Sequence, residues 1–135
     1  MKSKIQASLM ICVIILMVFV LMIAGPRNPK LAISYLSQTN EAGNNLAFFV
    51  ITNVGNVTLN IYRSGGLEIY GRDRNERVGC ETKLPRLEPG GADIATVYLP
   101  ASVESRWRFI IFFSSEGPGN KYGHAKFFAK SDWIK

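Results

Sequence analysis

The sequence predicts an all-β domain, a β-sandwich of about seven to eight strands, preceded by one N-terminal transmembrane helix. Two observations predict the sandwich. Short runs of aromatic and β-branched residues recur about every ten residues between Gly, Pro and Asn turns, and no amphipathic helical stretch interrupts them after residue 30. A third observation predicts the helix, because the first thirty residues contain one long apolar run.

Seven segments have the composition of strands, and an eighth is weakened by Gly79. The segment Leu46–Asn53 is apolar on both faces, which is typical of a central strand. The expected strands are Leu31–Leu36, Leu46–Asn53, Val57–Arg63, Leu67–Gly71, the weak Val78–Leu84, Ala92–Pro100, Arg106–Ser115 and His124–Lys130.

The strongest core pattern lies in Arg106–Ser115. Trp107 leads an alternating row on one face of this strand, and the row continues with Phe109, Ile111 and Phe113. We therefore expect Trp107 to be buried and to be one of the most important residues for stability.

Polar or glycine-rich segments are expected to connect the strands. Val54–Asn56 interrupts an otherwise apolar stretch with residues that tolerate positive φ, so it predicts a tight connection between two strands. Ser64–Gly66 is expected to be a turn, Ser37–Asn45 a polar loop, and Leu87–Gly91 a turn with proline before glycine.

The stretch FFVITNVGNVTL, followed by LEPGGADIATVYLP and then WRF, resembles immunoglobulin-like bacterial domains of the adhesion-related type. The resemblance covers roughly residues 31–115, and it extends to small bacterial proteins with one membrane anchor and one such domain. It implies an immunoglobulin-like sandwich in a bacterial envelope protein. The cysteine pair of antibody domains is absent, and a shared sandwich implies no particular activity.

The apolar run Ile5–Ala24 is about as long as a helix that crosses a bilayer. Gly25 and Pro26 would end that helix. We expect a retained signal-anchor, because cleavage after Ala24 would place Met22 where signal peptidase prefers a small residue. The alternative is a cleaved signal peptide and a secreted soluble domain.

The flanking charges predict the orientation of this span. Lys2, Lys4 and the α-amine lie before it, whereas Arg27 and Lys30 follow it, so the N-terminus is expected in the cytoplasm and the domain outside. The predicted organisation is an anchor and short linker over residues 1–30, and an immunoglobulin-like domain over residues 31–135.

The charge distribution argues against a nucleic-acid partner. The chain carries a net charge of +6, from 16 basic and 10 acidic residues. Residues 1–30 hold 4 of the basic residues and no acidic residue, which leaves 12 against 10 in the domain. A phosphate-binding surface needs clustered cations, and the domain is almost balanced.

The sequence predicts neither an enzyme nor a metal or cofactor site. His124 is the single histidine, and no nucleophile elbow, metal-ligand motif or phosphate-binding loop is present. Cys12 lies in the apolar run, so Cys80 is the only thiol of the domain and cannot form an internal disulfide. We expect Cys80 to be a partly buried structural residue, with an intermolecular disulfide as the less favoured alternative.

We therefore expect a membrane-anchored, non-enzymatic module that contacts another envelope protein or has a structural role. The alternative is a carbohydrate-binding or hydrolytic accessory domain that uses loop carboxylates such as Glu88 and Asp93.

Aromatic residues near the C-terminus are the candidate partner contacts: Tyr122, Phe128 and Trp133. Phe127 and Phe128 are adjacent on a strand, so one is expected in the core and the other outside. A competing and favoured interpretation is that the tail folds back and covers one end of the sandwich with Trp133.

Overall fold

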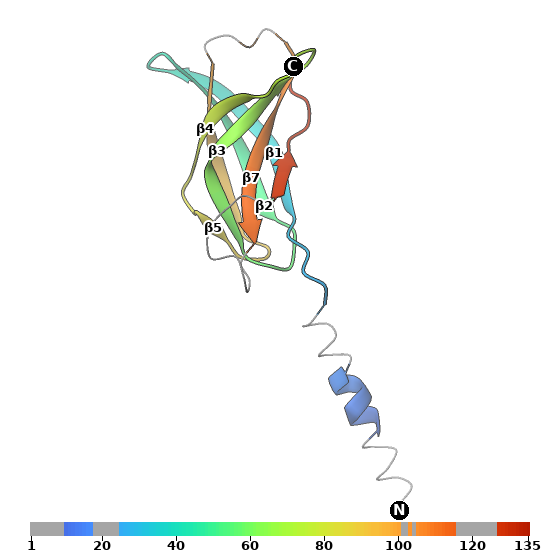
Figure 1. The fold of residues 1–135 in the computed structure, drawn as a ribbon. Helices are drawn as coiled ribbons and strands as arrows, with labels where there is room; N and C mark the ends of the chain where they lie inside the picture. Colours follow the sequence, from blue (N-terminus) through green and yellow to red (C-terminus); the bar gives the residue numbers. More distant parts are fainter. Residues whose placement is uncertain (1–9, 18–24, 101–102, 104, 116–126) are drawn as a thin grey trace, which may run out of the picture.

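The computed structural model describes residues 10–17, 25–100, 103, 105–115 and 127–135. Apart from a helix at residues 10–17, these residues form β-strands and their connections (Figure 1). The strands are β1 (Leu31–Glu41), β2 (Asn44–Asn53), β3 (Leu59–Ile69), β4 (Glu76–Thr82), β5 (Arg86–Leu87), β6 (Ala92–Leu99), β7 (Trp107–Ser115) and β8 (Phe127–Lys130). The predicted all-β class is confirmed for this part of the chain.

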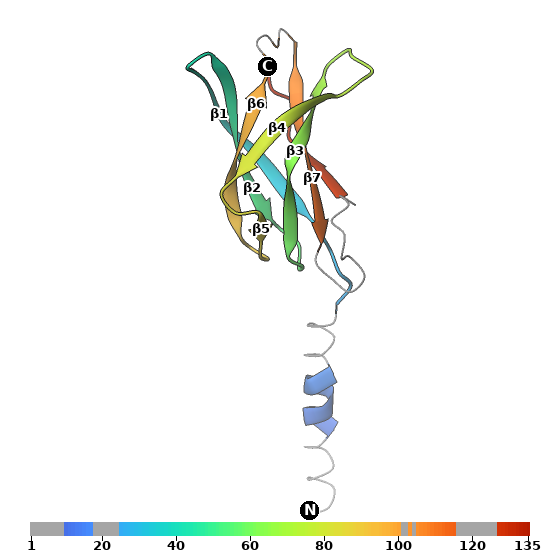
Figure 2. The same cartoon turned by 60° about the vertical axis from the view of Figure 1, so that its left-hand side comes forward.

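The strands form one curled antiparallel sheet in the order β1-β2-β6-β4-β3-β7-β8, with β5 paired to the start of β3. Strand β4 joins the two halves, since Glu76–Gly79 pair with β3 whereas Cys80–Thr82 pair with β6. Figure 2 shows the two halves curving around a common interior. The edge strands β1 and β8 thereby come near each other, and Cα atoms of the two strands lie within 8 Å.

The core fills this curl with residues from both halves of the sheet. Phe49 of β2 packs against Phe109 of β7, with ring centroids 5.1 Å apart. Trp107 is 2% exposed and meets Phe49 edge-on, with centroids 6.1 Å apart. Phe109, Ile111 and Phe113 are buried on the same face, so the predicted core row of β7 is confirmed.

The predicted turn at Ser64–Gly66 is wrong, because these residues lie inside the continuous strand β3. The pairing with β7 changes register between Ile61 and Gly65, so the glycines accompany an irregularity within the strand. A Cβ atom on Gly65 would lie 2.4 Å from Cε2 of Phe109. Glycine is needed here for the close approach of a core ring.

The predicted loop Ser37–Asn45 is also mostly strand. β1 continues to Glu41, and its polar end pairs with β2 through a hairpin whose turn residues Ala42 and Gly43 have positive φ. Polar residues are tolerated there because this part of the hairpin is exposed. The short strand β5 was likewise not predicted, since its two residues lie at the edge of the expected Leu87–Gly91 turn.

A connection is present at Val54–Asn56 as predicted, but none of these residues has positive φ, and the two strands that it joins do not pair with each other. The fully buried Asn53 organises it. Its Nδ2 donates to the carbonyl oxygens of Val57 (2.8 Å) and Leu87 (2.9 Å), and its Oδ1 accepts from the N–H of Gly55 (3.0 Å). The connection therefore carries the chain from β2 to the other half of the sheet.

The predicted linker Arg27–Lys30, together with Pro26 before it, binds to this connection. The N–H groups of Val54 and Gly55 donate to the carbonyl oxygen of Lys30, at 3.0 and 3.1 Å. Asn56 exchanges hydrogen bonds with the backbone of Asn28 and also donates to the carbonyl of Pro26. This part of the chain is thus fixed on the domain.

The predicted span Ile5–Ala24 lies mostly outside the described residues, which include only its central part, residues 10–17. In the part of the chain that the structure describes, no helix has both the length and the apolar character needed to cross a bilayer.

Candidate functional site

The predicted partner-contact residues have different positions in the structure. Tyr122 lies outside the described residues. Phe128 on β8 is 61% exposed, whereas its neighbour Phe127 packs against the core, so the prediction that they face opposite sides is confirmed. Trp133 is half-buried, and the tail that carries it folds back onto the sheet.

The tail is held by backbone hydrogen bonds at the start of β7. Trp107 and Ile134 form an antiparallel bridge, with N–H···O distances of 3.0 and 2.7 Å. Beside it, the N–H of Tyr70 donates to the carbonyl oxygen of Arg106 at 2.8 Å. The end of β3, the start of β7 and the C-terminal tail therefore meet at one end of the sheet.

Three side chains from these segments form what we call the aromatic–arginine patch: Tyr70, Arg106 and Trp133. The rings of Tyr70 and Trp133 meet edge to face, with centroids 5.8 Å apart. The guanidinium carbon of Arg106 lies 5.2 Å from the centroid of Tyr70 and 5.9 Å from that of Trp133. Tyr70 is 62% exposed and Arg106 is exposed, so the patch faces solvent.

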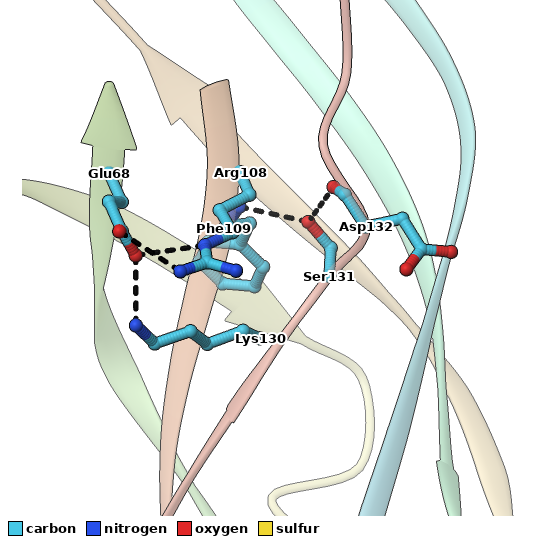
Figure 3. A network of polar contacts seen from close by, with 6 residues as sticks. All are labelled: Glu68, Arg108, Phe109, Lys130, Ser131 and Asp132. Atoms are coloured by element: carbon cyan, nitrogen blue, oxygen red, sulfur yellow. Dashed lines mark hydrogen bonds and ion pairs between the residues drawn. The ribbon is translucent and has the colours of Figure 1, made fainter. Parts of the chain in front are cut away.

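A network of charged side chains on the outer face of β3, β7 and β8 supports this patch (Figure 3). Arg108 donates through Nε and Nη2 to the two carboxylate oxygens of Glu68, at 2.9 and 3.0 Å. Lys130 donates to the same carboxylate at 2.9 Å. The guanidinium of Arg108 also lies 4.5 Å from the centroid of Trp133, so the network is in direct contact with the patch.

Glu68 is held ionised by these donors. Hydrogen bonds from Arg108 and then Lys130 lower the pKa of its carboxyl from 4.5 to about 2. A carboxylate with so low a pKa does not serve as a general acid near neutral pH. Glu68 therefore has a structural role: its carboxylate orients the guanidinium of Arg108.

Figure 3 also shows how the tail is fixed next to the network. The buried hydroxyl of Ser131 accepts a hydrogen bond from the N–H of Phe109 at 3.0 Å, and it donates to the carbonyl of Asp132 at 2.9 Å. These bonds set the path of the residues immediately before Trp133. The orientation of its indole ring thus depends on a buried contact with β7.

Arg106 differs from Arg108 in having no carboxylate partner among the described residues. Its guanidinium rests on two rings, and it retains hydrogen-bond donors at the surface. A planar guanidinium can bind a carboxylate through two parallel hydrogen bonds. The patch can therefore bind an anionic group next to apolar surface.

The loop carboxylates of the alternative prediction have local structural contacts. Glu88 accepts a hydrogen bond from the hydroxyl of Thr58 at 2.7 Å and forms an ion pair with Arg86 at 3.3 Å. Asp93 accepts a hydrogen bond from the N–H of Leu84 at 2.7 Å. Each carboxylate thus stabilises a connection near its own strand.

The remaining candidate residues that the structure describes do not lie among side chains that could form a catalytic or metal site. Cys80 is 1% exposed, and burial raises the pKa of its thiol to about 12, so it remains protonated and unreactive. His124 lies outside the described residues. Among the residues that the structure does describe, no group of three or more His, Cys, Asp or Glu side chains could hold a metal ion.

No family model, curated protein or solved structure matches this chain.

Sequence reasoning identified Trp133 but missed Tyr70 and Arg106. A signal for each was present, since Tyr70 lies two residues after Glu68, on the same face of the predicted strand Leu67–Gly71, and Arg106 precedes the buried Trp107. Their contact depends on the pairing of Ile69 with Trp107, which is a property of the sheet register.

Proposed function

We propose that this chain is a membrane-anchored, immunoglobulin-like β-sandwich module without enzymatic activity, which contacts another envelope protein through the aromatic–arginine patch. The observation that carries the proposal is the exposed guanidinium of Arg106 on the rings of Tyr70 and Trp133. Trp, Tyr and Arg are the residues most enriched at the energetic centres of protein interfaces. The partner surface should present a carboxylate beside apolar groups.

The position of the patch agrees with an anchored module. Strand β1 begins at one end of the sheet, next to residues 26–30, whereas the C-terminus lies at the opposite end (Figures 1 and 2). If Ile5–Ala24 anchors the chain, the patch faces away from the bilayer, where a partner can reach it. The continuous antiparallel curl, with β4 shared by both halves, supports a sandwich architecture.

A photoreactive amino acid at position 70 tests the interface in native membranes. The full chain should form one discrete adduct, and Arg106→Gln should reduce that adduct about tenfold or more, since one lost charge-assisted hydrogen-bond pair is worth about 1.5–3 kcal/mol. The matched control places the same photoreactive residue at Tyr98, another partly exposed tyrosine, on β6. An equal adduct from both positions, or one that is insensitive to Arg106→Gln, would refute the interface.

The anchor is tested separately. Intact mass of the membrane-extracted protein should include residues 1–24, and protease added to spheroplasts should digest the domain while a cytoplasmic control protein survives. A mature form beginning near Gly25 would show a cleaved signal peptide. A protected domain would place it on the cytoplasmic side of the membrane.

A further inference from the structure

The outer faces of the two halves of the sheet differ in charge. On β3, β7 and β8 the outer face carries the ion-paired Glu68, Arg108 and Lys130. On the other half, alternate residues of β2 and β6 are buried in the core, and the residues between them point outward and are uncharged. We call the central six of these outward residues the β2–β6 face: Leu46, Phe48, Val50, Ile94, Thr96 and Tyr98.

The β2–β6 face is a continuous apolar surface. Its side chains are cross-strand neighbours, since Leu46 pairs with Tyr98 and Val50 pairs with Ile94. Ile94 and Tyr98 are 45% and 39% exposed, and the residues of β2 are half-buried. An antiparallel sheet with one solvated face normally has polar residues on that face. The apolar outward side of β2 therefore indicates an interaction surface.

The charges around the face restrict the kind of partner. β2 and β6 contain no lysine or arginine, and basic residues are what an anionic membrane surface attracts. At the rim, Glu81 of β4 pairs with Thr96, and a hydrogen bond with the Glu81 carboxylate raises the pKa of Tyr98. A charged protein surface would need opposite charges on this face. The partner surface is therefore uncharged and apolar at its centre.

A second copy of this chain has such a surface. In a two-fold dimer the same face of each copy meets the other, so a charge near the axis would meet a like charge. The β2–β6 face has none. Its strands run between the end next to residues 26–30 and the opposite end of the domain (Figure 2). Two copies anchored in one bilayer can therefore bring these faces together about an axis perpendicular to the membrane.

The size of the face predicts a weak dimer. The half-sheet β1-β2-β6-β4 is four strands wide, or about 19 Å, and the 8 residues of β6 extend over about 27 Å, which gives about 500 Å² per copy. A total of about 1,000 Å² is at the low end for a specific interface. Tethering in one membrane raises the effective concentration of the second copy, so such a contact can form there.

We propose that two copies of this chain pair in one membrane through their β2–β6 faces, sheet against sheet. With the two-fold axis over the seam between β2 and β6, Leu46 of each copy lies opposite Tyr98 of the other, and Val50 lies opposite Ile94. This self-association goes beyond the contact at the aromatic–arginine patch, with which it shares no residue. It rests on the proposed anchor for its strength.

Cysteine cross-linking of the full chain in native membranes tests the dimer. The chain carries Cys12→Ser and Thr96→Cys, while Cys80 is buried and does not react. A short bismaleimide should give a product of twice the 15.0 kDa of the chain. The matched control is Phe128→Cys in the same background, on the outer face of the other half and 61% exposed, which should stay monomeric. No product from position 96, or equal products from both positions, would overturn the proposal.

A charge swap identifies the second copy as the partner. Ile94→Lys and Ile94→Glu, each added to the Thr96→Cys chain, place like charges across the axis and should each reduce the product about tenfold. Co-expression of the two variants should restore it, which also shows that both are folded. A face that binds the bilayer or a different protein would not recover in the mixture. Urea unfolding checks the fold of each variant, and a mixture of folded variants without product would overturn the proposal.

One further variant separates this dimer from the contact at the patch. Arg106→Gln should leave the position-96 product unchanged, although it should reduce the adduct formed from position 70. A photoreactive residue at position 98 should give only the self-adduct, at twice the mass of the chain. Loss of the position-96 product in Arg106→Gln would show that the patch, and not the β2–β6 face, holds the copies together.

Discussion

Backbone hydrogen bonds occur at both ends of the sheet, but the side chains at the two ends make different contacts. At the end where β1 begins, residues 26–30 and the Val54–Asn56 connection are joined by directional hydrogen bonds among backbone groups and asparagine side chains. At the opposite end, Tyr70, Arg106 and Trp133 are joined by ring and cation–π contacts. The first end uses its polar groups internally, whereas the second leaves a guanidinium exposed.

This difference shows where binding capacity can remain in a small β-domain. Each hydrogen bond occupies one donor and one acceptor, so the Asn53–Asn56 region has few free donors or acceptors with which to bind a partner. A cation–π contact uses the face of a ring and leaves the N–H donors of the cation available. The patch end can therefore be rigid and still bind an anionic group, which is the basis of the proposed interface.

The largest expected effect is a loss of stability when the buried Trp107, at the patch end of the sheet, is truncated. Trp107→Ala should destabilise the domain by about 3–5 kcal/mol, because it removes a buried aromatic side chain that contacts Phe49 and Tyr35. Urea unfolding of the full chain measures the change. Tyr70→Ala is the matched control, since Tyr70 is 62% exposed and should cost far less. Equal losses would contradict the assignment of core and surface at this end.

The second largest loss of stability is expected at the other end of the sheet, when the hydrogen bonds of the Asn53 side chain are removed. Asn53→Ala should cost about 1–3 kcal/mol, because the buried carbonyl of Leu87 loses its donor from Asn53 and the Gly55 N–H loses an acceptor. Thermal unfolding gives the difference, and hydrogen exchange should show faster exchange at Val54 and Gly55. Asn44→Ala, an exposed position in the β1–β2 hairpin, is the control and should be nearly neutral. A neutral Asn53→Ala would mean that this end does not depend on its hydrogen bonds.

The smallest effect concerns the charged network beside the patch. The pKa of Glu68 is lowered, so its contribution to stability is complete above its ordinary pKa of 4.5 and is lost as the pH falls through about 2. The melting temperature of Glu68→Gln should therefore lie below that of the wild type at pH 6, and the two should converge between pH 4.5 and 2. A difference that persists unchanged at pH 2 would show that it does not arise from the ionised carboxylate.

Single segments of the fold were predictable because their patterns are local. The alternation of Trp107, Phe109, Ile111 and Phe113 marks a buried strand face whatever the strand pairs with. The Ser64–Gly66 stretch misled the prediction because the same glycines suit a turn and a strand beneath a core ring. Only the position of Phe109, which is far away in the sequence, decides between them.

The sequence by itself determined the all-β class, the burial of the β7 row and the opposite orientation of Phe127 and Phe128, because each follows from the two-residue period of a strand. The tertiary structure decided which strands lie next to one another. The register of β3 and β7 placed Tyr70 beside Arg106. The curl of the sheet placed Leu31 opposite β8. Register and closure depend on packing between segments up to about a hundred residues apart, which no local pattern encodes.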